Sequence, residues 1–68
     1  MKYPILAYFE YEHLPQTLQD VSKPFHDLAH AVANTLPGTN AETKVGLRKL
    51  LESKDCCVRA ALPMKASL

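Results

Sequence analysis

The sequence lacks the features of a membrane-spanning, secreted or disulfide-linked protein. No apolar run approaches the roughly 18 residues that a membrane span needs, and the N-terminus lacks the apolar core and cleavage site of a signal peptide. The only cysteines are the adjacent Cys56 and Cys57. Neighbours on a helix point about 100° apart, so these two thiols cannot bridge each other. We therefore expect a cytosolic protein with free thiols.

The sequence also lacks strong charge and recognisable catalytic motifs. A net charge of +1 provides no general attraction for DNA or RNA polymers. No Gly-rich phosphate loop, dinucleotide-binding turn or H-E-x-x-H motif occurs. His26 and His30 lie four residues apart and would need an acidic partner, Asp27 or Glu10, to hold a metal ion. We expect a protein that binds without catalysis, with no metal and no cofactor.

Two amphipathic segments, residues 14–36 and 41–62, predict an all-α antiparallel hairpin, because apolar residues recur in both at steps of three and four. Between them Pro37 stops the first helix, and Thr39-Asn40-Ala41-Glu42 fits a capping box that opens the second. Pro24 predicts either one bent helix or a short helix followed by a longer one, and Pro63 predicts the end of the second helix. The predicted core stripes comprise Leu14, Leu18, Val21, Phe25, Leu28, Ala29, Val32 and Leu36, then Val45, Leu47, Leu50, Leu51, Val58, Ala61 and Leu62.

These segments divide the chain into an N-terminal arm (1–13), a helical hairpin (14–62, with its turn at 37–39) and a C-terminal tail (63–68). A lone hairpin of this length buries little apolar surface, although 47% of the residues are hydrophobic. We expect the missing core to come from copies of the same chain. The protein would then be a helix-packed homo-oligomer whose function depends on its subunit interfaces.

The N-terminal arm holds four of the five aromatic residues, namely Tyr3, Tyr8, Phe9 and Tyr11. Two interpretations of the arm stay open. It can cap the hairpin, since aromatic rings bury large areas, or its rings can stack on nucleobases. In an extended arm Phe9 and Tyr11 would point to the same side.

A weakly basic edge is predicted where this arm folds back on the first helix. Lys23, His26 and His30 recur there at steps of three and four, and they carry the charge that a phosphodiester ligand needs. The candidate ligand-binding residues of the arm and this edge are therefore Tyr8, Phe9, Tyr11, Lys23, His26 and His30.

Several short motifs occur in an order that resembles a known family. They are Phe9-x-Tyr11, Leu14-Pro15, Leu18-Gln19, Phe25-His26-Asp27-Leu28-Ala29, Leu36-Pro37, Glu42 and Gly46-Leu47-Arg48-Lys49-Leu50-Leu51-Glu52. Over about residues 9 to 62 this order is similar to the bacteriophage helical-hairpin sponges that counter cyclic-oligonucleotide (CBASS) and Thoeris immune signalling. Those proteins have an F-x-Y arm, an L-A pair before a C-P or L-P turn, and an acidic-capped second helix.

The resemblance implies a compact homo-oligomer, commonly a hexamer, in the cytoplasm of an infected bacterium. It implies a protein that sequesters cyclic di- or trinucleotides or cyclic ADP-ribose variants without cleaving them, which blocks activation of the host immune effector. In relatives a tyrosine at the position of Tyr11 stacks on a base, and a lysine at the position of His26 approaches the phosphates. Histidine replaces that lysine here, so either Lys23 supplies the cation or the preferred messenger differs. By position Arg59 would line a second pocket near the symmetry axis, although Pro63-Met64 stands where an arginine often follows.

Two alternatives belong to other functional classes. A structural or regulatory helical interaction module would have no small-molecule ligand, and its aromatic arm would only cap the core. A weak metal-dependent enzyme would be built on His26, His30 and an acidic partner.

Overall fold

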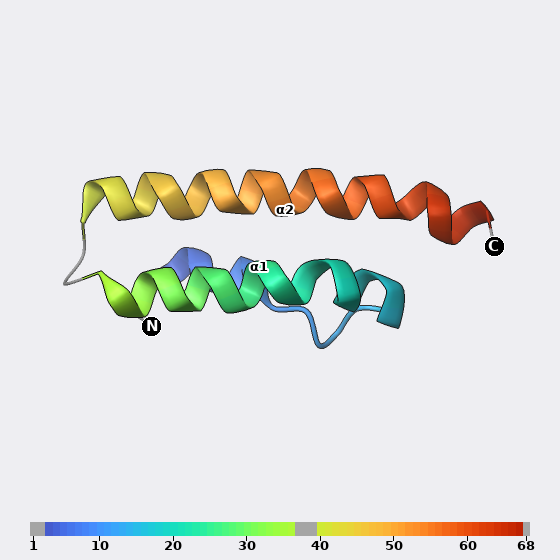
Figure 1. Ribbon diagram of the computed structural model, residues 1–68, viewed down its shortest axis with the longest axis horizontal. Coiled ribbons are helices and arrows are strands. Elements are labelled where there is room, and N and C mark those ends of the chain that lie inside the picture. Colours follow the sequence, from blue (N-terminus) through green and yellow to red (C-terminus); the bar gives the residue numbers. More distant parts are fainter. Residues whose placement is uncertain (1–2, 37–39, 68) are drawn as a thin grey trace.

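The computed structural model describes residues 3–36 and 40–67, with side chains up to residue 62. It contains a 3₁₀ helix, η1 (Pro4–Phe9), and two α-helices, α1 (Gln16–Thr35) and α2 (Ala41–Ser67). The two α-helices lie side by side in opposite directions, and η1 packs against both of them (Figure 1). The predicted all-α hairpin is confirmed, while its predicted turn at 37–39 lies outside the described residues.

The start of α2 is set by the side chain of Asn40. Its Oδ1 accepts hydrogen bonds from the N–H groups of Glu42 at 2.8 Å and Thr43 at 3.3 Å. N–H groups in the first turn of a helix have no carbonyl acceptor within the helix, so a side-chain acceptor stabilises its start. The side chain of Asn40 therefore caps α2, while Thr39, the first residue of the predicted capping box, lies outside the described residues.

Both helices continue through a proline. α1 is a single helix across Pro24, so the alternative of a short helix followed by a longer one is wrong. α2 runs past Pro63 to Ser67, so the prediction that Pro63 ends the helix is wrong. A proline removes one N–H group from the helical ladder, so the direct loss is one hydrogen bond to the turn before, and the neighbouring turns keep theirs. The final turns of α2 project beyond the start of α1 (Figure 1).

The core forms where η1 meets small residues of α1. Phe9 is fully buried, and it clusters with Ala29 and Ala33, whose short side chains allow the close approach of another element. The other buried members of this cluster are Tyr3, Leu6 and Leu47. Over the described ranges no helix contains an apolar stretch long enough to cross a membrane.

Three leucines of the predicted core stripes are exposed instead. Leu28 is 51% exposed, and Leu36 and Leu62 are also open to solvent. Their place in the core was predicted from helical periodicity alone, and that prediction is wrong for the single chain. Leu28 and Leu36 share one face of α1, where they line a shallow apolar groove with Val32.

Candidate functional site

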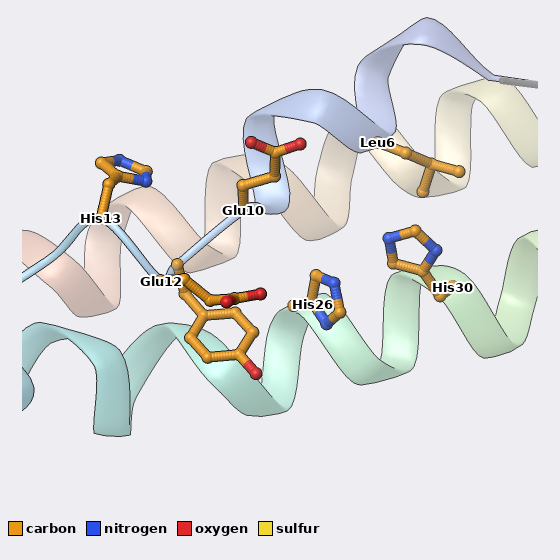
Figure 2. A pocket seen from close by; sticks show the side chains of 7 residues that line it. Leu6, Glu10, Glu12, His13, His26 and His30 are labelled. Atoms are coloured by element: carbon orange, nitrogen blue, oxygen red, sulfur yellow. The ribbon is translucent and has the colours of Figure 1, made fainter.

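A surface pocket of about 410 Å³ lies between the segment that follows η1 and one face of α1 (Figure 2). Three of the predicted ligand-binding residues, Tyr11, His26 and His30, line it together. The complete lining consists of Leu6, Glu10, Tyr11, Glu12, His13, His26 and His30. Its size falls within the range of small-molecule binding sites.

The three aromatic rings of this pocket form a continuous row. Tyr11 meets His26 edge-on, with ring centroids 5.0 Å apart and an interplanar angle of 70°. His26 lies next to His30, with centroids 4.4 Å apart and the rings tilted by 45°. A separation of four residues places both histidines on one face of α1, and both project toward η1 (Figure 2). The pocket therefore offers flat ring surfaces together with imidazole nitrogens.

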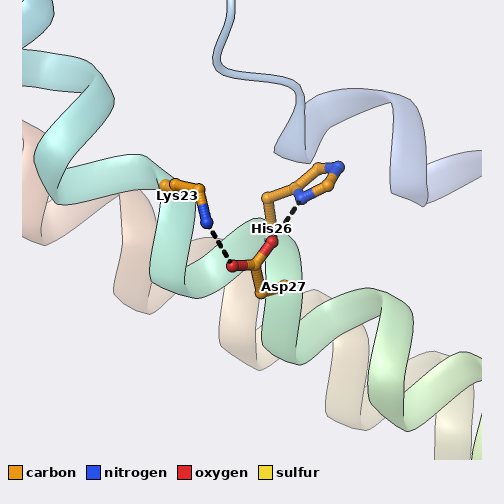
Figure 3. A network of polar contacts seen from close by, with 3 residues as sticks. All are labelled: Lys23, His26 and Asp27. Carbon is orange, nitrogen blue, oxygen red and sulfur yellow. Dashed lines mark hydrogen bonds and ion pairs between the residues drawn. The ribbon is translucent and has the colours of Figure 1, made fainter.

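Asp27 connects the edge of this pocket to the lysine that was predicted to bind phosphate. Its Oδ2 accepts a hydrogen bond from Lys23 Nζ at 2.9 Å, and its Oδ1 lies 3.0 Å from His26 Nδ1 (Figure 3). The hydrogen bond from His26, and then that from Lys23, hold the pKa of the Asp27 carboxyl below its ordinary value. The hydrogen bond between Lys23 and Asp27, and then the negative charge of Asp27, raise the pKa of the Lys23 ammonium above its ordinary value.

Carboxylates surround the predicted weakly basic edge, and its affinity for a phosphate stays a prediction. Lys23 points its ammonium at Asp27, and it does not line the pocket. Glu10 and Glu12 add two carboxyl groups to the lining. Glu12 and His13 were not indicated by any sequence pattern, although acidic residues on both sides of Tyr11 were a signal that this segment is polar and accessible.

The other predicted ligand-binding residues lie elsewhere. The Phe9 ring is fully buried in the core and has no face open to a ligand in the single chain. Tyr8 is 68% exposed but lines a different depression, beside Lys54 of α2. Arg59 donates a hydrogen bond from Nη2 to the Cys56 sulfur at 3.3 Å and is absent from the lining of the Tyr11 pocket.

The histidine pair does not form a metal centre with its acidic neighbours. Across residues 3–36 and 40–67, no three His, Cys, Asp or Glu side chains come close enough to hold a metal ion together. Both cysteines are free thiols and exposed. The side chains that line the pocket offer ring surfaces, hydrogen-bonding groups and carboxyl groups.

No protein-family model, curated protein or solved structure matches this chain.

Proposed function

We propose that this protein binds cyclic nucleotide second messengers and sequesters them without cleavage, as a bacteriophage protein that blocks a host immune effector. The observation that carries the proposal is the row of Tyr11, His26 and His30 in one pocket. Sequestration requires affinity and abundance but no stabilisation of a transition state. A small protein with a ring-lined pocket meets that requirement.

Each group in the pocket has a role in binding such a ligand. The Tyr11 ring stacks on a nucleobase, an interaction worth about 1–3 kcal/mol per base. The imidazole of His30 donates a hydrogen bond to a phosphate from one ring nitrogen when neutral and from both when protonated, whereas His26, whose Nδ1 is bound to Asp27, donates to a phosphate from Nε2 when protonated. His26 stands where the resembling family has a lysine.

The two carboxylates restrict how the ligand lies. Glu10 and Glu12 repel phosphate groups, so the phosphates face the histidine side of the pocket. The carboxylates then accept hydrogen bonds from N–H groups on the edge of the base, as acidic side chains do in base recognition. The proposal therefore favours a messenger whose base presents donors, such as guanine.

The pocket of one chain provides binding groups for only half of a cyclic dinucleotide. A cyclic dinucleotide has two bases and two phosphates, whereas each chain presents one Tyr11 and one His26–His30 pair. A symmetric pair of protomers would present two such sets to one ligand. The exposed leucines Leu28 and Leu36 supply apolar surface for self-association, and a homohexamer is the assembly that the resemblance implies.

Native mass spectrometry with a panel of cyclic dinucleotides, cyclic trinucleotides and cyclic ADP-ribose variants tests this proposal. We expect a homo-oligomer that gains the intact mass of at least one of these ligands, and release of the same mass on denaturation. Tyr11→Ala should keep the oligomer mass and bind the ligand about tenfold more weakly. An oligomer that binds no member of the panel would overturn the proposed function.

A helical interaction module is the second candidate, and the exposed groove of α1 favours it. Leu28, Val32 and Leu36 line this groove, which has a volume of about 350 Å³. Under this alternative the Tyr11 ring contributes only to packing, so Tyr11→Ala would lower the melting temperature of the protein and dissociate the oligomer. The two candidates thus predict opposite effects of the same substitution on oligomer mass.

A further inference from the structure

The Tyr11 ring is placed by a segment that has no helix or strand of its own. This segment runs from the end of η1 at Phe9 to the start of α1 at Gln16. Within it the Tyr11 carbonyl accepts a hydrogen bond from the N–H of Leu14 at 3.0 Å, which forms a local turn. A local turn shapes the segment but does not fix where it lies on the hairpin, so contacts from the long helices must do so.

Lys54 of α2 supplies one of these contacts. This lysine is only 8% exposed, and its Nζ donates a hydrogen bond to the carbonyl of Tyr8, 46 residues earlier in the chain. The same ammonium lies 6.0 Å from the centroid of the Phe9 ring, at the distance of a cation–π contact. Removing an ammonium from water is costly unless it is hydrogen-bonded, so these partners explain how a lysine is accommodated at this position.

The carbonyl that Lys54 binds belongs to the last turn of η1. Carbonyl groups at the end of a helix lack an internal donor and carry partial negative charge. Glu10 and Asp55 line the depression beside Lys54, yet within the described residues the lysine forms an ion pair with neither. The charge of Lys54 is thus directed at the main chain of the arm.

Gln19 of α1 holds the segment on the other side of Tyr11. Its Nε2 donates hydrogen bonds to the carbonyl of Leu14 at 2.8 Å and to the carbonyl of Glu12 at 3.4 Å. The segment is therefore attached to α2 before Tyr11 and to α1 after it.

We propose that Lys54 and Gln19 are positioning residues that hold the Tyr11 ring against His26. Neither side chain lines the Tyr11 pocket, so both act through the main chain on either side of Tyr11. The effect on ligand binding rests on the proposed function, whereas the position of the Tyr11 ring is measurable without a ligand.

The test compares four variants of the full chain by nuclear magnetic resonance and circular dichroism. Lys54→Met keeps the length of the side chain but removes the donor and the charge, while Lys54→Arg restores both. Gln19→Met removes the second attachment. Lys49→Met is the matched control, since Lys49 is an exposed lysine on the same helix.

The measurement that tests the proposal is the nuclear Overhauser effect between the ring protons of Tyr11 and His26, which reports their contact. We expect Lys54→Met and Gln19→Met each to weaken this contact and to shift the His26 ring protons, with helix content unchanged. Lys54→Arg should recover most of the contact, and Lys49→Met should leave it intact. The proposal fails if the contact survives in both Lys54→Met and Gln19→Met. It also fails if Lys54→Met unfolds the helices while Gln19→Met leaves the contact unchanged.

Ligand binding by the same variants then distinguishes a failure of the positioning role from a failure of the proposed function. With cyclic GMP–AMP as the probe, Lys54→Met should weaken binding about tenfold, and Lys54→Arg should stay within about threefold of the parent protein. Loss of the ring contact with unchanged binding would overturn the role of Tyr11 in the proposed function and leave the positioning role in place. Loss of binding with an intact ring contact would overturn the positioning role.

Discussion

The Tyr11 ring approaches the His26 imidazole edge-on, with 5.0 Å between the two ring centroids. Because this geometry leaves part of the tyrosine ring at the pocket surface, removing the ring should remove a stacking surface without emptying the core. Tyr11→Ala is expected to weaken cyclic dinucleotide binding about tenfold, which corresponds to ~1.4 kcal/mol. Isothermal titration calorimetry measures this loss, and Tyr11→Phe serves as a control that keeps the ring. Unchanged affinity in Tyr11→Ala would exclude stacking by this residue.

A second prediction concerns Asp27, whose carboxylate binds Lys23 and His26 at the edge of the pocket. Asp27→Asn removes the carboxylate that pairs with Lys23 and His26, so the Lys23 ammonium and the His26 imidazole become available to a phosphate. We expect a gain of about three- to tenfold in affinity for a cyclic dinucleotide, decreasing as salt is added. Asp20→Asn makes the same change of charge elsewhere on α1 and is the matched control. Equal affinity in the two variants would show that Lys23 does not reach the ligand.

The lowered pKa of Asp27 predicts how its pairing depends on pH. A free aspartate has a pKa of about 3.9, and the pairing in the folded protein lowers that value. The stabilisation is therefore fully present above the ordinary pKa and is lost as the pH falls through the lower pKa of the folded state. A carbon-13 titration of the Asp27 carboxyl should show this shift. The pKa should rise in both His26→Ala and Lys23→Met, because each substitution removes a hydrogen bond that lowers it, first that of His26 and then that of Lys23.

A fourth prediction separates the two neighbouring rings of η1. Phe9 is fully buried, so Phe9→Ala should destabilise the protein by about 3–5 kcal/mol and lower its melting temperature. The Tyr8 side chain is exposed, and its main-chain carbonyl still binds Lys54 after substitution, so Tyr8→Ala should change stability by less than about 0.5 kcal/mol. Thermal unfolding compares the two. A Phe9→Ala protein that melts normally but loses ligand would restore Phe9 as a binding residue.

Local sequence signals were sufficient to predict the hairpin but not its surface. Helical periodicity and the turn residues around Pro37 predict two antiparallel helices, and the structure has them. Periodicity cannot distinguish an apolar position that the chain itself covers from one that it leaves open, which is why Leu28 was assigned to the core. Ala29, which was predicted for the core, and Ala33, which was not, lie there because their short side chains let η1 approach α1 closely.

The candidate site was predictable only where its residues are close in the sequence. His26 and His30 share a helix face by spacing alone, and Tyr11 belongs to the aromatic cluster of the arm, where the resemblance implies a stacking role for it. Phe9 was assigned to the ligand on the assumption of an extended arm, but a 3₁₀ helix places its ring in the core. Lys54 reaches the arm across 46 residues, a contact for which no local pattern exists.

The exposed groove of α1 provides the last prediction. Leu28 and Leu36 line it, and a charge placed there remains hydrated in a monomer but would be desolvated in an interface. We expect Leu28→Glu to convert the proposed homo-oligomer into folded monomers with unchanged helix content, and Asn34→Glu, at an exposed polar position of the same helix, to leave the proposed assembly intact. Sedimentation velocity across a dilution series measures the change. If the parent protein already sediments as a well-folded monomer at low concentration, the groove is not a self-association surface. The proposed two-protomer binding site would then lose its second half.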